Sequence, residues 1–503
     1  MVDSLNDVVV EGVRVELYTN EAGRTYNVYY QNGIDTVVTA LNNYTLAANV
    51  ENLTLTGRGD LTGTGNELDN VIKGTDGKNE LFGGDGQDYL VGGLGADTLY
   101  GGKGNDTLYG GADRMDHIFD PNWTERSYPV DTLYGGEGDD TYYVKNAKDV
   151  VIETGEGNDW VYASVSYKIK ENVENLMLLG RNSMNGTGNE LDNRLIGNDG
   201  NNILNGLDGA DSLDGGYGND TLNGGEGDDT LDGGYELDVL FGGAGNDTYY
   251  VDSIDDKVFE KSDGGLSDTV LASVSFILSN FVENLTLIDP HSIDANSDVT
   301  QMYGTGNKWD NYITGNDLQN ILSGKDGNDT IIGGMGADTL YGGYGEDSLK
   351  SDGENSKLYG LYGQDTLESH GALSELYGGA DNDTLITTDS WNDTLDGGAG
   401  DDVLSAGSGF NILRGGADND QLLAGDGYND LYGGAGNDTL TAGSGGNRLY
   451  GGLGDDNLTA ASSNELYGGS GNDTLTAGLG GGYAYGGSGE DNCRIPEGDM
   501  AVS

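Results

Sequence analysis

Residues 83–109 read GGDGQDYLV, GGLGADTLY and GGKGNDTLY, which are three consecutive copies of one nonapeptide. The chain holds fourteen full copies of its GGxGxD core. The last three residues of a copy can form a short strand, in which Leu99 points one way and Thr98 and Tyr100 the other. The first six residues must turn the chain, and their glycines permit positive φ values and close backbone approach. The pattern therefore predicts an all-β solenoid with two nonapeptides in each coil.

The turns also share a chemistry. Each presents backbone carbonyls and, at position six, one aspartate carboxylate. Calcium takes such hard oxygen ligands in sets of about six to eight, and two stacked turns can each donate half of a set. The repeat therefore indicates calcium ions held between coils.

The composition points the same way. The chain has 86 acidic and 23 basic residues, a formal charge of -63, and 91 glycines. Self-repulsion and glycine entropy oppose a compact state without counter-ions. If about 20 turns each take one divalent ion, roughly 40 positive charges arrive, so metal binding should be coupled to folding. Nucleic acid is a poor partner for such a surface.

The cysteine count, the apolar runs and the first residues of the chain bear on disulfide bonds, on membrane insertion and on the export route. The single cysteine, Cys493, rules out an intramolecular disulfide framework. No apolar run approaches the length of about 18 residues that a transmembrane helix needs, so no transmembrane segment is expected. The first twelve residues lack the basic and apolar regions of a signal peptide.

A longer repeat is superimposed on the nonapeptides. VENLTL, VENLML and VENLTL begin at Val50, Val173 and Val282, and GTGN follows each at Gly63, Gly186 and Gly304. These anchors predict an N-terminal cap (1–33), module 1 (34–145, with an insertion at 112–130), module 2 (146–253), module 3 (254–491) and a C-terminal tail (492–503).

Module 3 contains an extended roll with two different edges. At a period of 18 residues, the turns that start at Gly397, Gly415, Gly433, Gly451, Gly468 and Gly486 keep the position-six aspartate. The turns between them, which start at Ala406, Ala424, Ala442 and Ala477, have largely lost it. We therefore expect one edge that is rich in calcium and one that is poor in it.

The stretch from Ile34 to Asp491 resembles the RTX, or haemolysin-type calcium-binding repeat, family. The resemblance implies a parallel β-roll in which the first six residues of each repeat bind calcium between turns. Carried over to turns that keep the acid, it implies these metal ligands: Asp88, Asp97, Asp106, Asp140, Asp211, Asp220, Asp229, Asp247, Asp329, Asp338, Asp347, Asp365, Asp383, Asp402, Asp420, Asp438, Asp456, Asp473 and Asp491.

The resemblance also implies export by type I secretion, with the chain unfolded in the low-calcium cytosol and folding in millimolar calcium outside. An extracellular or cell-surface location follows from it. With coils stacked at about 4.8 Å, the molecule is expected to be elongated, on the order of 130 Å at most.

Three functions are compatible with the sequence. We favour a non-enzymatic structural or adhesive protein, because repeats fill the chain and no known catalytic motif is present. The second is an enzyme with a site near the insertion 112–130, with Arg114, Asp116 and His117 as candidate catalytic residues. The third is a repeat region that serves a separate secreted toxin or hydrolase.

Tyrosines follow the inward residue on one sheet of the last block. They are Tyr341, Tyr359, Tyr377, Tyr432, Tyr450, Tyr467 and Tyr485. We expect these tyrosines to stack between coils. The alternative is a flat platform for polysaccharide, for a cell surface or for self-association.

Overall fold

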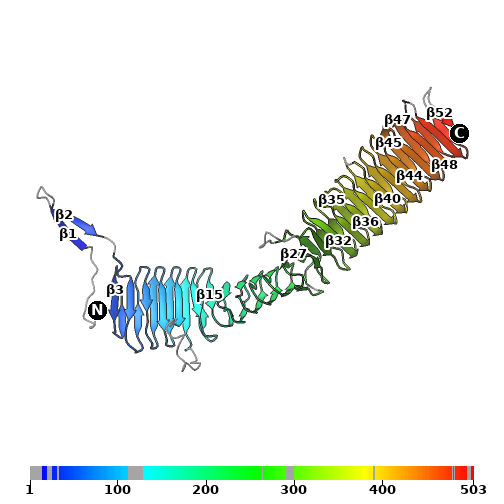
Figure 1. Cartoon of the computed structure of the whole chain (residues 1–503). Helices are drawn as coiled ribbons and strands as arrows, with labels where there is room; N and C mark the ends of the chain where they lie inside the picture. Colours follow the sequence, from blue (N-terminus) through cyan, green and yellow to red (C-terminus); the bar gives the residue numbers. More distant parts are fainter. Residues whose placement is uncertain are drawn as a thin grey trace. The chain divides into compact units, whose positions relative to one another are not determined.

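Short strands pair in parallel with the strand one coil away and build a parallel β-solenoid of about 24 turns (Figure 1). The predicted all-β parallel roll is therefore confirmed. The computed structural model describes residues 14–19, 25–30, 33–111, 129–262, 264–290, 299–388, 391–478, 480, 482–494 and 500–502. The chain divides into unit 1, Met1–Gly243, and unit 2, Ala244–Ser503.

Unit 1 opens with an antiparallel hairpin, β1 (Arg14–Thr19) and β2 (Thr25–Tyr30). Its odd-numbered strands then form one parallel sheet: β3 (Thr36–Thr39), β5 (Asn52–Leu55), β7 (Val71–Lys73), β9 (Tyr89–Gly93), β11 (Thr107–Gly111), β13 (Thr141–Val144), β15 (Trp160–Ala163), β17 (Asn175–Leu178), β19 (Arg194–Ile196), β21 (Ser212–Asp214) and β23 (Thr230–Asp232).

The even-numbered strands of unit 1 form two further sheets. The first contains β4 (Asn43–Thr45), β6 (Thr62–Thr64), β8 (Glu80–Asp85), β10 (Thr98–Lys103), β12 (Thr132–Glu137) and β14 (Val150–Ile152). The second contains β16 (Tyr167–Lys168), β18 (Asn185–Thr187), β20 (Ile203–Asp208), β22 (Thr221–Glu226) and β24 (Val239–Ala244).

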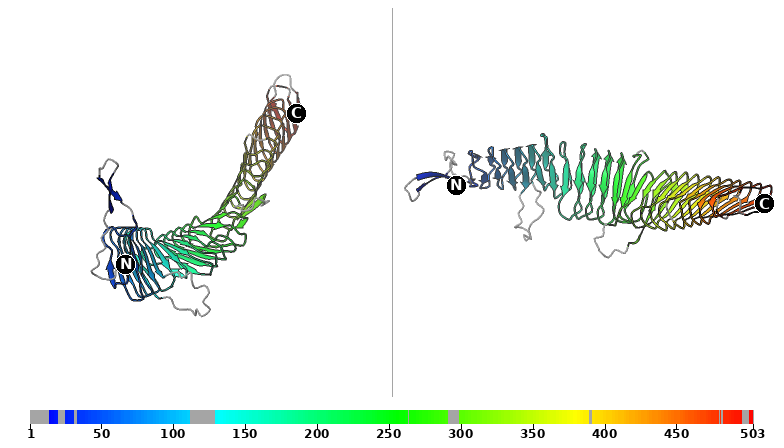
Figure 2. Two further views of the ribbon diagram at one scale, coloured as in Figure 1. Left: turned by 60° about the vertical axis from the view of Figure 1, so that its left-hand side comes forward. Right: turned by 90° about the horizontal axis from the view of Figure 1, so that it is seen from above.

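Unit 2 repeats the arrangement, and Figure 2 shows its coils side by side in both views. Its odd-numbered strands are β25 (Thr248–Val251), β27 (Thr269–Ala272), β29 (Asn284–Leu287), β31 (Tyr312–Thr314), β33 (Thr330–Ile332), β35 (Ser348–Ser351), β37 (Thr366–Ser369), β39 (Thr384–Thr387), β41 (Val403–Ala406), β43 (Gln421–Ala424), β45 (Thr439–Ser444), β47 (Asn457–Ser462), β49 (Thr474–Ala477) and β51 (Asn492–Arg494).

The even-numbered strands of unit 2 begin with β26 (Lys257–Phe259). A parallel sheet follows that contains β28 (Phe276–Ile277), β30 (Gln301–Thr305), β32 (Gln319–Asp326), β34 (Thr339–Tyr344), β36 (Lys357–Tyr362), β38 (Glu375–Ala380), β40 (Thr394–Ala399), β42 (Ile412–Ala417), β44 (Asp430–Ala435), β46 (Arg448–Leu453), β48 (Glu465–Ser470), β50 (Tyr483–Ser488) and β52 (Met500–Val502).

The core consists of columns of leucines that lie between the sheet of odd-numbered strands and the sheets of even-numbered strands. Leu99 of β10 is paired with Leu81 of β8 and with Leu133 of β12, and all three are fully buried, whereas their strand neighbours face outward. The register therefore places every position-eight residue over its equivalent one coil away. This is the alternation that the sequence predicts.

Many strands are longer than the three residues that the repeat predicts. Strand β10 continues through the first glycines of the next turn to Lys103, and Gly102 pairs with Gly84 of the coil before it. Gly102 has a φ of 123°, and a Cβ on it would lie 2.0 Å from the carbonyl oxygen of Gly84. Glycine allows this close stacking without strain, so pairing extends into the turns. Leu207, Lys325 and Leu361 hold the same position in other coils, also with positive φ.

Over the part of the chain that the structure describes, no helix is long and apolar enough to cross a membrane.

Candidate metal centres

The aspartates predicted as metal ligands all stand at position six of a turn, directly before a strand. All of them except Asp491 are at most 2% exposed, and Asp491 is partly buried. Carboxylates are almost never fully buried unless they are paired. A row of buried aspartates on successive coils therefore requires partners of another kind.

One oxygen of each carboxylate is held by the backbone. The N–H of Asp88 donates to Oδ1 of Asp106, one coil later, at 2.7 Å. In unit 2 the N–H of Asp420 donates to Oδ1 of Asp438 at 2.9 Å. This bond fixes the orientation of the carboxylate and leaves Oδ2 directed into the turn.

The second oxygen, Oδ2, is buried and accepts no hydrogen bond in sixteen of these position-six aspartates and their equivalents: Asp88, Asp97, Asp106, Asp140, Asp159, Asp211, Asp220, Asp329, Asp347, Asp365, Asp383, Asp402, Asp420, Asp438, Asp456 and Asp473. Buried polar atoms without a partner are rare in proteins, and each one needs an explanation. The same atom lies without a donor at the same place in successive turns. This regularity indicates that a bound cation, and not a hydrogen-bond donor of the chain, is the partner of Oδ2.

Main-chain oxygens lie beside these Oδ2 atoms. A Cβ built on Gly83 would lie 2.1 Å from Oδ2 of Asp88 and 2.6 Å from the carbonyl oxygen of Gly101, one coil later. A Cβ on Gly378 would meet Asp383 and the next coil in the same way, at 2.3 and 2.6 Å. A carboxylate and a carbonyl thus converge beside the first glycine of a turn. A set made only of oxygen donors fits calcium.

Burial raises the pKa of these carboxyl groups. Desolvation is the largest cause, and it raises the pKa of Asp88 to about 7 and that of Asp383 to about 8 against the opposing effect of a backbone hydrogen bond. Nearby carboxylates raise the pKa further in both cases. The ionised row is therefore unfavourable at neutral pH unless a positive charge shares the turns.

Three turns on one edge of unit 2 satisfy their position-six residue without a cation. Asn411, Asn429 and Asn447 occupy position six there, and the N–H of each donates to Oδ1 of the next asparagine in the row at 2.9 Å. Their Nδ2 groups also donate to the carbonyl oxygens of Gly407, Gly425 and Gly443, at 3.0 Å in each case. The side-chain amide thus donates a hydrogen bond to the turn, which a carboxylate in the same place cannot do.

The opposite edge of unit 2 keeps its acids. Every position-six residue before the odd-numbered strands from β33 to β51 is an aspartate, in a row from Asp329 to Asp491. Asp338 lies instead on the asparagine edge, where its Oδ2 accepts a hydrogen bond from Oγ of Ser351 at 3.2 Å. Asp338 therefore differs in its surroundings from the other predicted ligands.

Asparagines also begin the rows of aspartates, which the sequence analysis missed. Oδ1 of Asn70 accepts from the N–H of Asn66 at 2.7 Å, and its Nδ2 donates to the carbonyl oxygen of Glu51 at 3.1 Å. Its own N–H donates to Oδ1 of Asp88 at 2.7 Å. Asn193 and Asn311 repeat the first and last of these bonds. The last residue of each GTGNELDN-like motif thus closes a metal-free turn.

Further buried aspartates stand at position six in turns that depart from GGxGxD. They are Asp131, Asp149, Asp159, Asp238, Asp256, Asp268 and Asp393. Their signal in the sequence is the spacing to the neighbouring acids rather than the glycine pattern. Asp131 follows the insertion, and its Oδ2 lies 2.4 Å from a Cβ built on Gly110, so Gly110 and Asp131 come together as the first glycine and the aspartate of one turn. Arg114, Asp116 and His117 lie outside the described residues.

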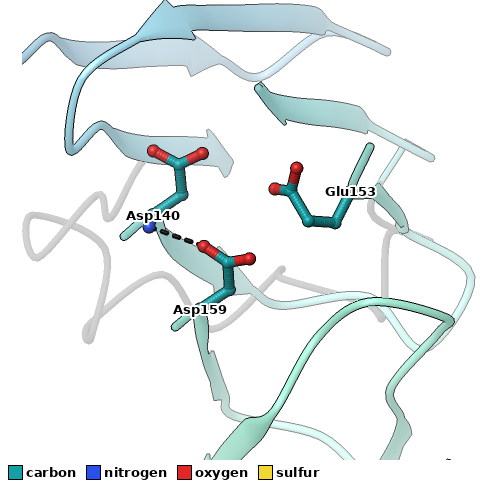
Figure 3. Close-up of side chains that lie close together, drawn as sticks. All are labelled: Asp140, Glu153 and Asp159. Carbon is teal, nitrogen blue, oxygen red and sulfur yellow. Dashed lines mark hydrogen bonds between the residues drawn. The ribbon is translucent and has the colours of Figure 1, made fainter. Parts of the chain in front are cut away.

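Among the residues that the structure describes, two clusters each bring three carboxylates together. Asp140, Glu153 and Asp159 form the first, which Figure 3 shows, and Asp247, Glu260 and Asp268 form the second. Within each cluster the ligand oxygens all lie within 4.8 Å of one another. Neither glutamate was among the predicted ligands, because neither belongs to a nonapeptide motif.

The seven tyrosines that follow the inward residue on one sheet of the last block form stacks of rings. Tyr432, Tyr450, Tyr467 and Tyr485 stack in sequence at centroid distances of 4.9 to 5.2 Å and interplanar angles of 4 to 7°. Tyr341, Tyr359 and Tyr377 form a second stack, and Asp396 and Arg414 separate the two in register. The ring faces are covered by neighbouring rings, which leaves the edges exposed. This arrangement supports the expected stacking between coils. It does not favour a platform for polysaccharide, because a sugar ring packs against a free aromatic face.

The fold and these sites define a parallel β-solenoid of the calcium-binding repeat type. In a comparison with protein-family models, the RTX calcium-binding nonapeptide repeat matches more than half of the chain, within residues 64–114, 130–151, 187–249, 314–458 and 459–493. The chain belongs to this family. A search of curated proteins gives no match.

Proposed function

We propose that this protein is a secreted, non-enzymatic structural protein whose roll orders when calcium binds between its turns. The observation that supports it best is the row of buried Oδ2 atoms without hydrogen-bond donors, repeated on successive coils. A row of ionised carboxylates without counter-charge opposes the fold. Calcium between coils supplies the positive charge and is coordinated by the Oδ2 atoms. The location that follows is extracellular or at the cell surface, where calcium reaches millimolar levels, after type I secretion.

The role we favour for the ordered protein is in a surface layer, a matrix or adhesion. The described coils are repeats from Thr36 to Arg494, and their surface is strongly acidic. Calcium can therefore act twice, inside the turns and as a bridge between acidic surfaces or copies of the chain. Self-association and attachment to a cell surface are both forms of this role.

The test is a calcium titration followed by circular dichroism and light scattering on the full chain. We expect β signal to rise cooperatively between sub-millimolar and millimolar calcium and to disappear in chelator. A rise in molecular mass at the same calcium concentrations supports self-association, and a constant mass excludes it under those conditions. Full β content in excess chelator would overturn the proposal.

A further inference from the structure

The cluster of Asp140, Glu153 and Asp159 differs from the ordinary turns in one ligand. Beside an ordinary first glycine, a carboxylate faces a main-chain carbonyl from the next coil. A Cβ built on Gly135 would instead meet the hydroxyl of Tyr142 at 2.0 Å, Oδ2 of Asp140 at 2.1 Å and Oε2 of Glu153 at 2.6 Å. A second carboxylate thus stands where a carbonyl oxygen lies elsewhere, and Figure 3 shows the three acids facing one another.

Two oxygens of this cluster are buried acceptors that no donor reaches. Asp140 and Asp159 are each 1% exposed, and Oδ2 of both accepts no hydrogen bond. Their Oδ1 atoms are held by the backbone N–H groups of Asp106 and Asp140, at 2.7 Å in both cases. The unsatisfied atoms are therefore fixed in place and directed into the cluster.

Glu153 is fixed just as firmly. Its Oε1 accepts from the N–H groups of Thr154 and Gly155 at 2.6 and 2.8 Å, and its Oε2 accepts from the hydroxyl of Tyr142 at 2.5 Å. Tyr142 is fully buried and takes the position that leucine holds in ordinary repeats. In the second cluster, the hydroxyl of Tyr249 donates to Glu260 in the same way.

From this geometry we infer that the cluster of Asp140, Glu153 and Asp159 is a distinct cation site, which binds calcium more tightly than the ordinary turns. Calcium affinity in proteins rises with the number of charged ligands and with their rigidity, and this cluster has more of both. The inference rests on the proposed calcium-dependent folding and places this turn in a separate class of sites.

Equilibrium dialysis of the full-length chain with radioactive calcium tests the inference. We expect about one ion per chain to bind at least about tenfold more tightly than the others. Glu153→Gln should move this ion from the tight class to the weak class. The control is Glu156→Gln, which removes an exposed charge from the same turn as Glu153 and should leave the tight class unchanged.

Circular dichroism in saturating calcium shows whether the variants fold. If Glu153→Gln does not fold, Glu153→Asp replaces it, since it keeps the charge and withdraws it by one methylene. We then expect partial weakening of one tight ion, and unchanged tight binding counts against the inference. A folded chain with one uniform class of sites overturns this inference alone, whereas absence of calcium-induced folding overturns the proposed function with it.

Discussion

At the scale of the residue, position six decides whether a turn needs a cation. Aspartate and asparagine occupy the same place, and Oδ1 of both accepts the N–H one coil earlier, as for Asp438 and Asn447. They differ in the second atom. Nδ2 of Asn447 donates to a carbonyl, whereas Oδ2 of Asp438 has no donor. The exchange of one group therefore changes a calcium-dependent turn into a self-sufficient one.

Asp456→Asn tests this exchange directly. We expect the chain to fold in saturating calcium, because the amide can bond as Asn447 does, but to bind about one calcium ion fewer. Asp455→Asn is the matched control, since it removes the same charge from the adjacent exposed position, where Asn437 stands one coil earlier. Equilibrium dialysis counts the ions. An unchanged count in Asp456→Asn would show that this carboxylate is not a ligand.

The raised pKa values predict opposite effects of pH with and without calcium. Unfolded aspartates titrate near 3.8, and the pKa of Asp106 in the ion-free fold is about 7. Protonation therefore stabilises the ion-free fold below about 3.8, and this stabilisation is lost as the pH rises through about 7. In chelator, β signal should rise when the pH falls from 8 to 5.

In calcium the sign reverses, because protons compete with the ion for the same carboxylates. The calcium midpoint should rise as the pH falls below 7. Circular dichroism measures both effects, and light scattering must exclude precipitation near the isoelectric point of 4.1. A calcium midpoint that does not change between pH 8 and pH 6 contradicts the involvement of buried carboxylates.

At the scale of the element, the strands are short and gain their stability from repetition. Most contribute one buried apolar residue at position eight, such as Leu440 over Leu422, and the turn before each strand bonds to the next coil. Neighbouring coils interact with each other and not with distant ones, so a change in one turn acts locally. The asparagine row is therefore expected to stabilise its own edge only.

Asn447→Asp should destabilise this edge even when calcium is saturating. The substitution removes Nδ2 donors to Gly443 and Asn464 and places a carboxylate oxygen against a carbonyl, at a cost of about 2 kcal/mol. Hydrogen exchange of residues 439–465 measures the local free energy of opening. Asn437→Asp, at an exposed position, is the control and should exchange as the unsubstituted chain does. Equal protection in both variants would contradict the role of the amide row.

At the scale of the whole molecule, charge dominates. A formal charge of -63 on 503 residues favours an expanded chain, and only ions that enter the turns can remove the repulsion where it is strongest. Ions that merely screen the surface leave the buried carboxylates unsatisfied. The identity of the cation should therefore matter more than the ionic strength.

Calcium, magnesium and sodium chloride should separate these effects. Millimolar calcium is expected to give both compaction and β structure. Magnesium at the same concentration should give much less, because it demands octahedral geometry and retains water ligands. About 1 M sodium chloride should compact the chain by screening without restoring β signal. Dynamic light scattering and circular dichroism measure the two responses, and equal β signal in magnesium would contradict ligation in the turns.

The sequence predicts the column of leucines and the position-six acids because both follow from the period of the repeat. Leu99, Asp97 and Asp106 need only a nine-residue count to be placed. The roles of Asn70 and Asn447 could not be predicted in this way, since the partners of an amide become known only when coils are stacked. Glu153 was missed for a similar reason: it lies outside the nonapeptide and reaches Asp140 only through the fold.

The two edges of unit 2 give it an unequal response to a partial fall in calcium, which empties some turns but does not remove the ion as a chelator does. The row of aspartates would regain its mutual repulsion, while Asn411, Asn429 and Asn447 would keep their hydrogen bonds. Adjacent coils would stay aligned along that seam, with each repeat still opposite its proper neighbour. When calcium returns, only the aspartate edge would have to re-form. The strands would already be in the correct register, although the repeats are nearly identical in sequence.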